Sequence, residues 1–95
     1  MAHSHAEIAT PFASRYLVQL SKHWSHKFAV EWDATHSHIP LSGADCRLEA
    51  KDGLLIADLD APEADLERVQ GVVANHLNRF AFKEGELAFD WVRAD

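Results

Sequence analysis

The sequence predicts an α+β fold: a two-layer sandwich in which two helices pack on one face of a mostly antiparallel sheet. Two stretches place apolar residues at helical spacing, and six shorter stretches alternate apolar and polar residues between turn signals. Taken in chain order they give the pattern β-α-β-β-β-β-α-β. With 95 residues, 47% hydrophobic and 25% charged, the chain is expected to form one domain, residues 1–95, with one modest core.

The first strand is predicted to be short, since Ala6 and Ile8 alternate with Glu7. A helix is predicted to follow over about residues 11–26. Thr10 is its expected N-cap, and Pro11 occupies the first helical position, where the missing N–H breaks no hydrogen bond. The buried face of this helix consists of apolar residues at helical spacing: Ala13, Tyr16, Leu17, Leu20 and Trp24.

Four strands are predicted between the two helices. Residues 28–32 alternate as a half-buried strand, and residues 37–41 form a weaker strand whose Pro40 indicates an edge or irregular position. Residues 46–50 and 54–60 form the other two. Asp52-Gly53 between them is a strong signal for a two-residue hairpin turn.

The second helix is predicted to start at Pro62, with its buried face made by Leu66, Val69, Val73, Leu77 and Phe80. A final strand follows, in which Leu87, Phe89 and Trp91 share one face. With both helices on one side, the other face of the sheet must be covered by polar side chains or by a partner. A homodimer is one way to provide that partner.

Composition narrows the class of protein. The lone Cys46 allows no intramolecular disulfide, and its alternating context predicts a reduced, buried residue. No apolar run reaches the length of a signal peptide or a membrane span, so we expect a cytoplasmic protein without membrane contact. The net charge of −6 argues against binding to nucleic acid.

Positive charge is concentrated near the end of the first helix. Residues 8–30 contain no acid, while Lys22, His23, His26 and Lys27 lie within two helical turns. Such a cluster suits the carboxylate, phosphate or catecholate oxygens of an anionic ligand. Cations in a last helical turn also stabilise the helix dipole and the free carbonyls, so the pattern alone leaves both roles open.

His76 lies in the predicted buried stripe of the second helix, three residues after Val73 and four before Phe80. A buried imidazole requires a hydrogen-bond partner. His76 is therefore either a satisfied core residue or a general base or ligand contact, and Arg79 and Lys83 follow it on the same helix.

The number of strands decides whether the two clusters meet. Four strands between the helices predict antiparallel helices, whose C-terminal ends lie at opposite ends of the helix layer. The clusters at residues 22–27 and 76–83 are then expected to lie apart. If residues 37–41 form no strand, the parity reverses and the two clusters come together.

Two His-Ser-His triplets, His3/His5 and His36/His38, place paired imidazoles on one face of a strand. As a zinc or iron pattern this is weak, because carboxylate or thiolate ligands at fixed spacing are missing. No phosphate-binding glycine loop, nucleophile elbow or paired-cysteine motif occurs. We therefore predict neither a metal site nor a cofactor.

Three stretches resemble the signature of a bacterial family, domain of unknown function 2218. They are residues 10–27 around Lys22-His23-Trp24-Ser25-His26-Lys27, residues 46–50, and residues 76–84 followed by Trp91. The family pattern usually has Cys where Ser21 stands and Phe where Trp24 stands, so the resemblance implies no essential thiol at that position. The candidate site residues that coincide with the family motif are Lys22, His23, His26, Lys27, His76, Arg79 and Phe80.

The resemblance also implies a biological context, because some family members are associated with siderophore-interacting ferric reductases. The leading hypothesis is a non-catalytic cytoplasmic binding or accessory domain linked to iron–siderophore handling. Its helix end would contact an anionic small molecule or a siderophore-related flavoprotein. The alternatives are a small enzyme with His76 or His23 as general acid/base, and an oligomerisation module that uses the open sheet face.

Overall fold

The computed structural model describes residues 1–93 and confirms the α+β class and the predicted order of elements. The elements are β1 (Ala2–Ala9), α1 (Ala13–Ser25), β2 (Glu31–Trp32), β3 (His36–Leu41), β4 (Ala44–Lys51), β5 (Leu54–Ala61), α2 (Leu66–Phe80) and β6 (Val92–Arg93). The strands form one sheet in the order β2-β3-β4-β5-β1-β6, with neighbouring strands antiparallel. Within residues 1–93, no helix combines the length and the apolar character that crossing a bilayer requires.

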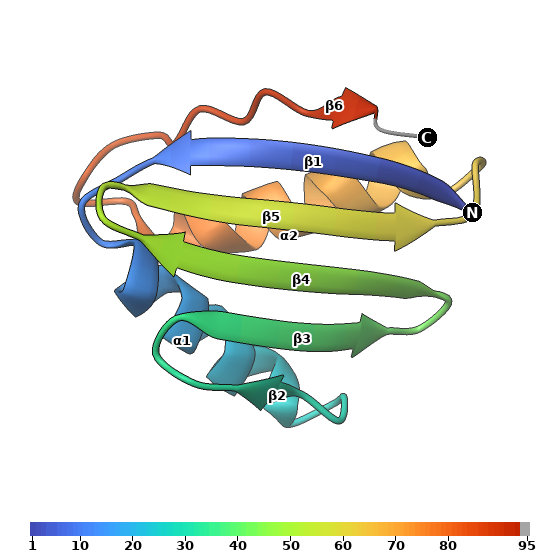
Figure 1. Cartoon of the computed structure of the whole chain (residues 1–95), viewed down its shortest axis with the longest axis horizontal. Coiled ribbons are helices and arrows are strands. Elements are labelled where there is room, and N and C mark those ends of the chain that lie inside the picture. Colours follow the sequence, from blue (N-terminus) through green and yellow to red (C-terminus); the bar gives the residue numbers. More distant parts are fainter. Residues whose placement is uncertain (94–95) are drawn as a thin grey trace.

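Both helices lie behind the sheet, on one face of it (Figure 1). The cross-strand register explains why. Cys46 of β4 lies opposite Leu59 of β5, and both side chains are buried. Arg47 and Asp58, the next pair along, point to the other face and stay in contact with solvent. The two-residue period therefore gives the sheet an apolar inner face and a polar outer face.

The core lies between the inner face of the sheet and the helices. It confirms the predicted buried faces of α1 and α2, except that Phe80 is only half-buried. The largest fully buried apolar side chains are Ile8, Leu17, Leu20, Ile39, Leu55, Leu59, Leu77 and Val73.

Both helices begin later than predicted. α1 starts at Ala13, after a turn over residues 11–12 in which the Thr10 hydroxyl accepts the Phe12 N–H at 3.1 Å. α2 starts at Leu66, after a turn closed by the Asp65 N–H and the Pro62 carbonyl at 2.8 Å. In both places the proline sets the backbone of a turn that precedes the helix, because its fixed φ suits a turn as well as a first helical residue.

Strand β2 is much shorter than predicted. It contains Glu31 and Trp32, both exposed, so the expected half-buried strand over residues 28–32 is wrong. Phe28 and Val30 pack against the core from irregular backbone. The physical reason is local, since the Val30 N–H bonds to the Phe28 carbonyl at 2.9 Å and is not available to a neighbouring strand.

Pro40 sits where β3 acts as an edge. β2 pairs with only Ser37 and His38 of β3, so Pro40 is paired on the β4 side alone, opposite Asp45. A proline without an N–H breaks no ladder bond at such a position. The sequence-based expectation of an edge is confirmed at this residue, although β3 as a whole lies inside the sheet.

The last predicted strand is mostly irregular, and β6 includes only Val92–Arg93. Leu87 is buried, while Phe89 and Trp91 stack with ring centroids 5.9 Å apart and an angle of 17° between the rings. All three pack against the core. The prediction that Leu87, Phe89 and Trp91 face the same side is therefore correct, but most of this segment packs on the core as irregular backbone and not as a strand.

The Asp52-Gly53 hairpin is confirmed. Lys51 and Leu54 face each other across it, and Gly53 has φ of +73°. Glycine adopts this left-handed conformation without the steric cost that a Cβ atom brings. The turn therefore joins β4 and β5 in the register that buries Cys46 and Leu59.

A buried tyrosine ties the segment after α2 to the start of α1. The Tyr16 hydroxyl donates to the Glu84 carboxylate at 2.5 Å, and the Thr10 hydroxyl donates to the same oxygen at 3.0 Å. Burial, together with the carboxylate, raises the pKa of Tyr16, so the phenol stays a donor at neutral pH. Glu84 belongs to one of the stretches that carry the family resemblance, and its role here is structural.

The four strands between the helices are all present, and Figure 1 shows α1 and α2 running in roughly opposite directions. The expectation that the two clusters lie apart is nevertheless wrong where the end of α1 meets α2. His23 of α1 and His76 of α2 have ring centroids 5.2 Å apart. The end of α1 crosses α2 where His76 lies, one turn before α2 ends at Phe80, so antiparallel helices still bring these side chains together.

Candidate functional site

A cavity of about 520 Å³ lies between the C-terminal end of α1, the side of α2 and the turn from β3 to β4; we name it the helix cleft. Its volume is in the range of small-molecule sites. The lining residues are His23, Trp24, His26, Lys27, Phe28, Leu41, Ser42, Ala44, Arg68, Val69, Val72 and His76.

Local hydrogen bonds shape the end of α1. The Trp24 carbonyl accepts the N–H groups of Lys27 and Phe28 at 3.0 and 2.8 Å, and the Ser25 hydroxyl donates to the Lys22 carbonyl at 2.7 Å. Backbone and serine donors thus satisfy carbonyls that a lysine would otherwise cap. The Lys27 ammonium instead lies 5.9 Å from the centre of the Phe28 ring, at the cleft.

Aromatic rings gather on one side of the helix cleft. The His76 ring lies 4.9 Å from the Trp24 ring and 5.2 Å from the His23 ring, and the His23 ring lies 6.2 Å from the Phe80 ring. These contacts are tilted or edge-on, with angles of 48°, 50° and 71°. Aromatic pairs prefer such geometries, so the cluster holds both imidazoles in defined positions.

His76 is half-buried at the edge of the helix stripe, not sealed in the core as its spacing suggested. Its Nδ1–H donates to the Val72 carbonyl, one turn earlier in α2, at 2.7 Å. Because a carbonyl only accepts, this contact places a proton on Nδ1. Nε2 has no hydrogen bond within residues 1–93, and the His76 residue belongs to the lining of the cleft.

Lys27 and Arg68 bring permanent positive charge to the cleft. Lys27 has no ion pair within residues 1–93. Arg68 pairs with Asp65 at 3.7 Å, and because the two side chains are 64% and 45% exposed, this pair contributes little. No carboxylate belongs to the described lining of the cleft, so the cavity is locally positive in a chain of net charge −6.

The structure brings only part of the predicted cluster together. His23, His26, Lys27 and His76 line the cleft, whereas Lys22 and Arg79 are exposed and lie outside its lining. Consecutive helical residues point about 100° apart, so Lys22 turns away where His23 turns in. Arg79 lies almost one turn beyond His76 towards the end of α2, past the part of the helix that lines the cleft.

Sequence reasoning missed Arg68. Arg68, Val72 and His76 are spaced four residues apart and therefore lie along one side of α2. Extending that stripe backwards from His76 would have identified Arg68 as a further cation facing the end of α1.

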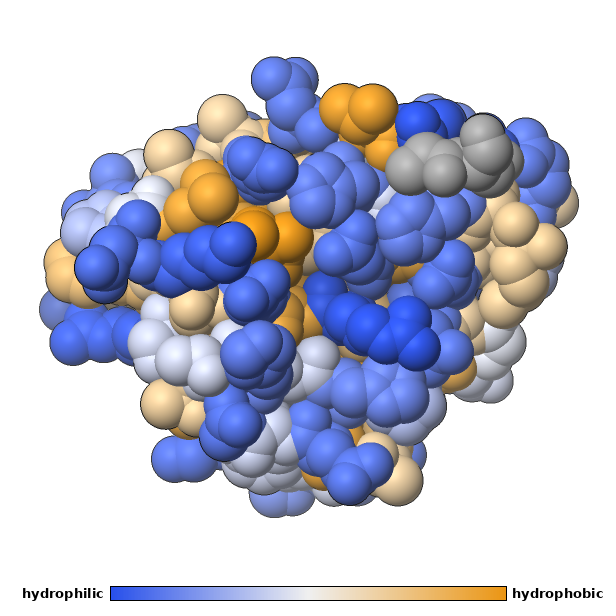
Figure 2. Space-filling model, viewed as in Figure 1, coloured by the Kyte–Doolittle hydropathy of each residue, from blue (hydrophilic) through white to orange (hydrophobic). Residues whose placement is uncertain are grey.

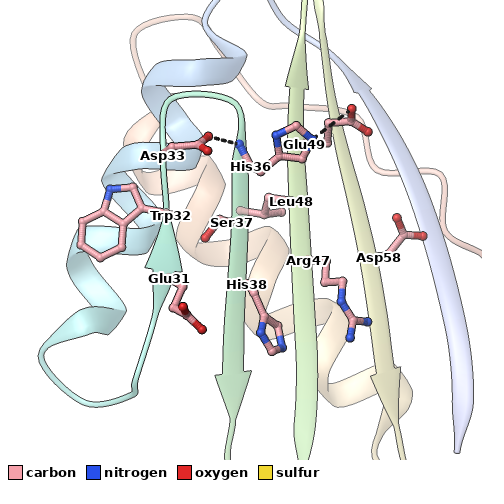
Figure 3. A pocket seen from close by; sticks show the side chains of 10 residues that line it. All are labelled: Glu31, Trp32, Asp33, His36, Ser37, His38, Arg47, Leu48, Glu49 and Asp58. Atoms are coloured by element: carbon pink, nitrogen blue, oxygen red, sulfur yellow. Dashed lines mark hydrogen bonds and ion pairs between the residues drawn. The ribbon is translucent and has the colours of Figure 1, made fainter.

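A second hollow, of about 580 Å³, lies on the open face of the sheet over β3 and β4 (Figure 3). Figure 3 shows His36 directed towards Glu49 on the next strand, with Arg47 and Asp58 on β4 and β5. The lining consists of Glu31, Trp32, Asp33, His36, Ser37, His38, Arg47, Leu48, Glu49 and Asp58.

Charges around this sheet-face hollow largely pair with one another. Cross-strand contacts of 3.5, 2.9 and 3.4 Å join His36 to Glu49, His38 to Asp45 and Arg47 to Asp60. Figure 2 shows that the open face is mostly hydrophilic, so polar side chains cover it, as one of the two expectations required. The hollow mixes both signs of charge, whereas the helix cleft presents one sign with weak internal pairing. The helix cleft is therefore the better candidate site.

The first histidine triplet belongs to a network on the same open face. His3 contacts Asp60 at 2.9 Å and Asp58 at 3.2 Å, and His5 contacts Asp58 at 2.7 Å and Glu7 at 3.0 Å. The hydrogen bond that His3 donates to Asp60 is the main cause that raises the pKa of His3, and the hydrogen bond that His5 donates to Asp58 is the main cause that raises the pKa of His5. Both histidines thus stay protonated to higher pH in the folded protein than in the unfolded chain.

This network makes stability pH-dependent. A histidine whose pKa is raised by folding contributes fully below the unfolded value of about 6.5, and the contribution is lost as pH rises through the folded pKa. We expect the free energy of unfolding to fall as pH rises above about 6.5, by a few tenths to about 1 kcal/mol, since the pairs are partly solvent-exposed. Urea unfolding of wild type and of the variant with His3→Gln and His5→Gln would measure it. The variant should lose this slope, and exposed His26→Gln should keep it; equal slopes in all three would contradict the assignment.

Two further chemistries find no support within residues 1–93. Cys46 is fully buried, and burial raises its pKa to about 12, so the thiol stays protonated and is not a nucleophile at neutral pH. No group of three or more His, Cys, Asp or Glu side chains in this part of the chain is arranged to hold a metal ion. His3, His5 and His38 contact carboxylates of the sheet instead.

Residues 5–92 match the profile of a family described as "Uncharacterized protein conserved in bacteria (DUF2218)". The chain belongs to this family. The chain is also similar to a solved structure, the NMR structure of PA4090 from Pseudomonas aeruginosa, with 35% sequence identity and a TM-score of 0.81; the match covers 97% of this chain and 96% of that one. Among curated proteins, none matches. The family match and the solved structure thus give a bacterial family and a fold. The function of this DUF2218 protein has to be inferred from the candidate site.

Proposed function

We propose that this DUF2218 protein is a non-catalytic binding domain that holds a small anionic molecule in the helix cleft. One observation carries the proposal: within the described residues the cleft contains Lys27, Arg68 and three histidines but no carboxylate, although the chain has a net charge of −6. Apolar walls with a few convergent polar groups are typical of small-molecule sites. The sign of the charge selects an anion.

Each group in the cleft has a distinct role in this proposal. Lys27 and Arg68 supply permanent charge, and Arg68 can meet a carboxylate or phosphate with two parallel N–H donors. His76 keeps its Nδ1–H on the Val72 carbonyl, so Nε2 is the nitrogen that meets a ligand. Val69 and Val72 provide contact for the non-polar part of the molecule.

The finer part of the proposal concerns iron. The family resemblance implies iron–siderophore handling and a cytoplasmic setting, and both stay predictions. A siderophore, whose iron-binding oxygens are anionic, would place them against Lys27 and Arg68. The alternative occupant is a partner flavoprotein that presents an acidic side chain to the same two cations.

An amide NMR titration of labelled protein tests the site. The probes are inorganic phosphate, citrate, and gallium-loaded catecholate and hydroxamate siderophores, since gallium replaces ferric iron without paramagnetic broadening. Saturable shifts at cleft residues support anion binding, and shifts with the gallium complexes also support the iron link. If no probe shifts the cleft amides at millimolar concentration, the proposed function is wrong; if only the gallium complexes fail, the iron link alone is lost.

A matched pair of double variants separates the cleft from general electrostatics. Lys27→Gln with Arg68→Gln removes two charges that line the cleft, and Lys22→Gln with Arg79→Gln removes two charges from the same region outside it. Because a charge-assisted hydrogen bond is worth about 1.5–3 kcal/mol, we expect the first variant to weaken binding at least tenfold. The second should stay within about twofold of wild type, and an equal loss in both would place the ligand elsewhere.

A further inference from the structure

Several of the described residues that line the helix cleft have aromatic rings. His23, Trp24, Phe28 and His76 come from two different parts of the fold and line one cavity. Trp24 is 6% exposed and supplies a fixed wall, while His23 is exposed and presents its ring to solvent. The rings of His23, Trp24 and His76 already contact each other at 4.9–6.5 Å between centroids. A ligand that enters the cleft therefore meets ring surfaces next to cations.

The two kinds of group are close enough to act on one small molecule. The Lys27 ammonium lies 5.9 Å from the centre of the Phe28 ring, and Arg68 shares one side of α2 with His76. A flat ring packs edge-on or offset against other rings, and its carboxylate then meets a neighbouring ammonium or guanidinium. An aliphatic acid of equal size gains the charge interaction but not the ring contacts.

We infer that the ligand of the helix cleft is an aromatic anion, a planar ring that carries a carboxylate or another acidic oxygen group. The ring packs against His23, His76 and Phe28, and the acidic group faces Lys27 and Arg68. This inference rests on the proposed function and names the chemical class of its ligand. The exposed ring of His23 is the specificity-determining contact.

The test compares two acids that differ only in aromaticity, benzoate and cyclohexanecarboxylate, by amide NMR titration of the full chain with inorganic phosphate in parallel. Aromatic pairs contribute about 0.5–1.5 kcal/mol beyond area burial, so benzoate should bind about two- to tenfold more tightly. Equal affinity, or tighter binding of the saturated acid, overturns the aromatic class and leaves anion binding intact. If phosphate binds and neither organic acid does, the aromatic class is likewise overturned and anion binding stands. If none of the three probes shifts the cleft amides, the proposed function is overturned as well.

Two substitutions at one exposed position provide the matched control. His23→Phe keeps a ring and His23→Leu removes it, while both remove the imidazole nitrogens, so the charge of the cleft is the same in the two variants. His23→Phe should keep the preference for benzoate, and His23→Leu should reduce it, with the remaining preference supplied by His76 and Phe28. An unchanged preference in His23→Leu would remove His23 from the specificity assignment.

Discussion

Truncation of Leu59 to alanine should lower the free energy of unfolding by about 2–5 kcal/mol. Leu59 is fully buried on β5, the strand between β4 and β1, and is paired with Cys46 on one side and Ser4 on the other. Strands on both sides limit how far the backbone can collapse into the space, so most of the cavity remains. Because small domains are stable by only about 5–15 kcal/mol, the variant would lose a large fraction of its stability.

Urea denaturation measures this loss as a lower midpoint with an unchanged slope. Leu54→Ala is the matched control, since Leu54 is the same residue type on the same strand but is half-exposed at its start. It should cost about 1 kcal/mol or less, in proportion to the smaller apolar area removed from water. Similar losses at both positions would show that β5 does not divide into a buried and an open face.

A buried pair of serines should show a pronounced asymmetry on mutation. The Ser21 hydroxyl donates to the Leu17 carbonyl at 2.7 Å, and it lies 2.6 Å from the Ser37 hydroxyl. A hydroxyl has one hydrogen, so with that of Ser21 on Leu17, Ser37 is the donor within the pair. Ser21→Ala then leaves a buried donor without an acceptor and should cost about 1–3 kcal/mol.

Substitution of the other serine, Ser37, should destabilise the protein less. Ser37→Ala leaves Ser21 bonded to Leu17 and costs less than about 1 kcal/mol, since only an acceptor position is lost. The double variant should be more stable than Ser21→Ala alone, because neither partner then remains unsatisfied. Urea unfolding of the three variants decides the matter, and a Ser37→Ala cost above that of Ser21→Ala would reverse the donor assignment.

Residues that carry the family resemblance divide between structure and site. Glu84 accepts hydrogen bonds from Tyr16 and Thr10 and so holds the segment after α2 against the start of α1. Trp24 is buried and packs on His76. His23 and Lys27 are exposed and line the cleft. The packing of the fold does not explain why the described lining of this cleft contains no acidic residue. These exposed residues are the stronger candidates for binding.

Sequence patterns predicted secondary structure best in long elements, where the same spacing of apolar residues recurs over many positions. Both helices show their buried stripes, and β4 and β5 alternate on either side of an Asp-Gly turn, so class and order could be predicted. β2 and β6 have two residues each, and their longer alternating stretches pack on the core as irregular backbone. Alternation reports which side chains are buried, and it does not report whether the backbone hydrogen-bonds to a neighbouring strand.

For the candidate site, the sequence by itself determined that positive charge gathers at the end of α1 and that His76 lies on the inner side of α2. It left the relative direction of the helices dependent on whether residues 37–41 form a strand, and the presence of β3 settled that question. Only the tertiary structure decided that His23 meets His76, that Arg68 joins them and that Lys22 and Arg79 stay outside. The place where two helices cross is set by how their side chains pack across the interface, and periodicity within each helix contains no information about that offset.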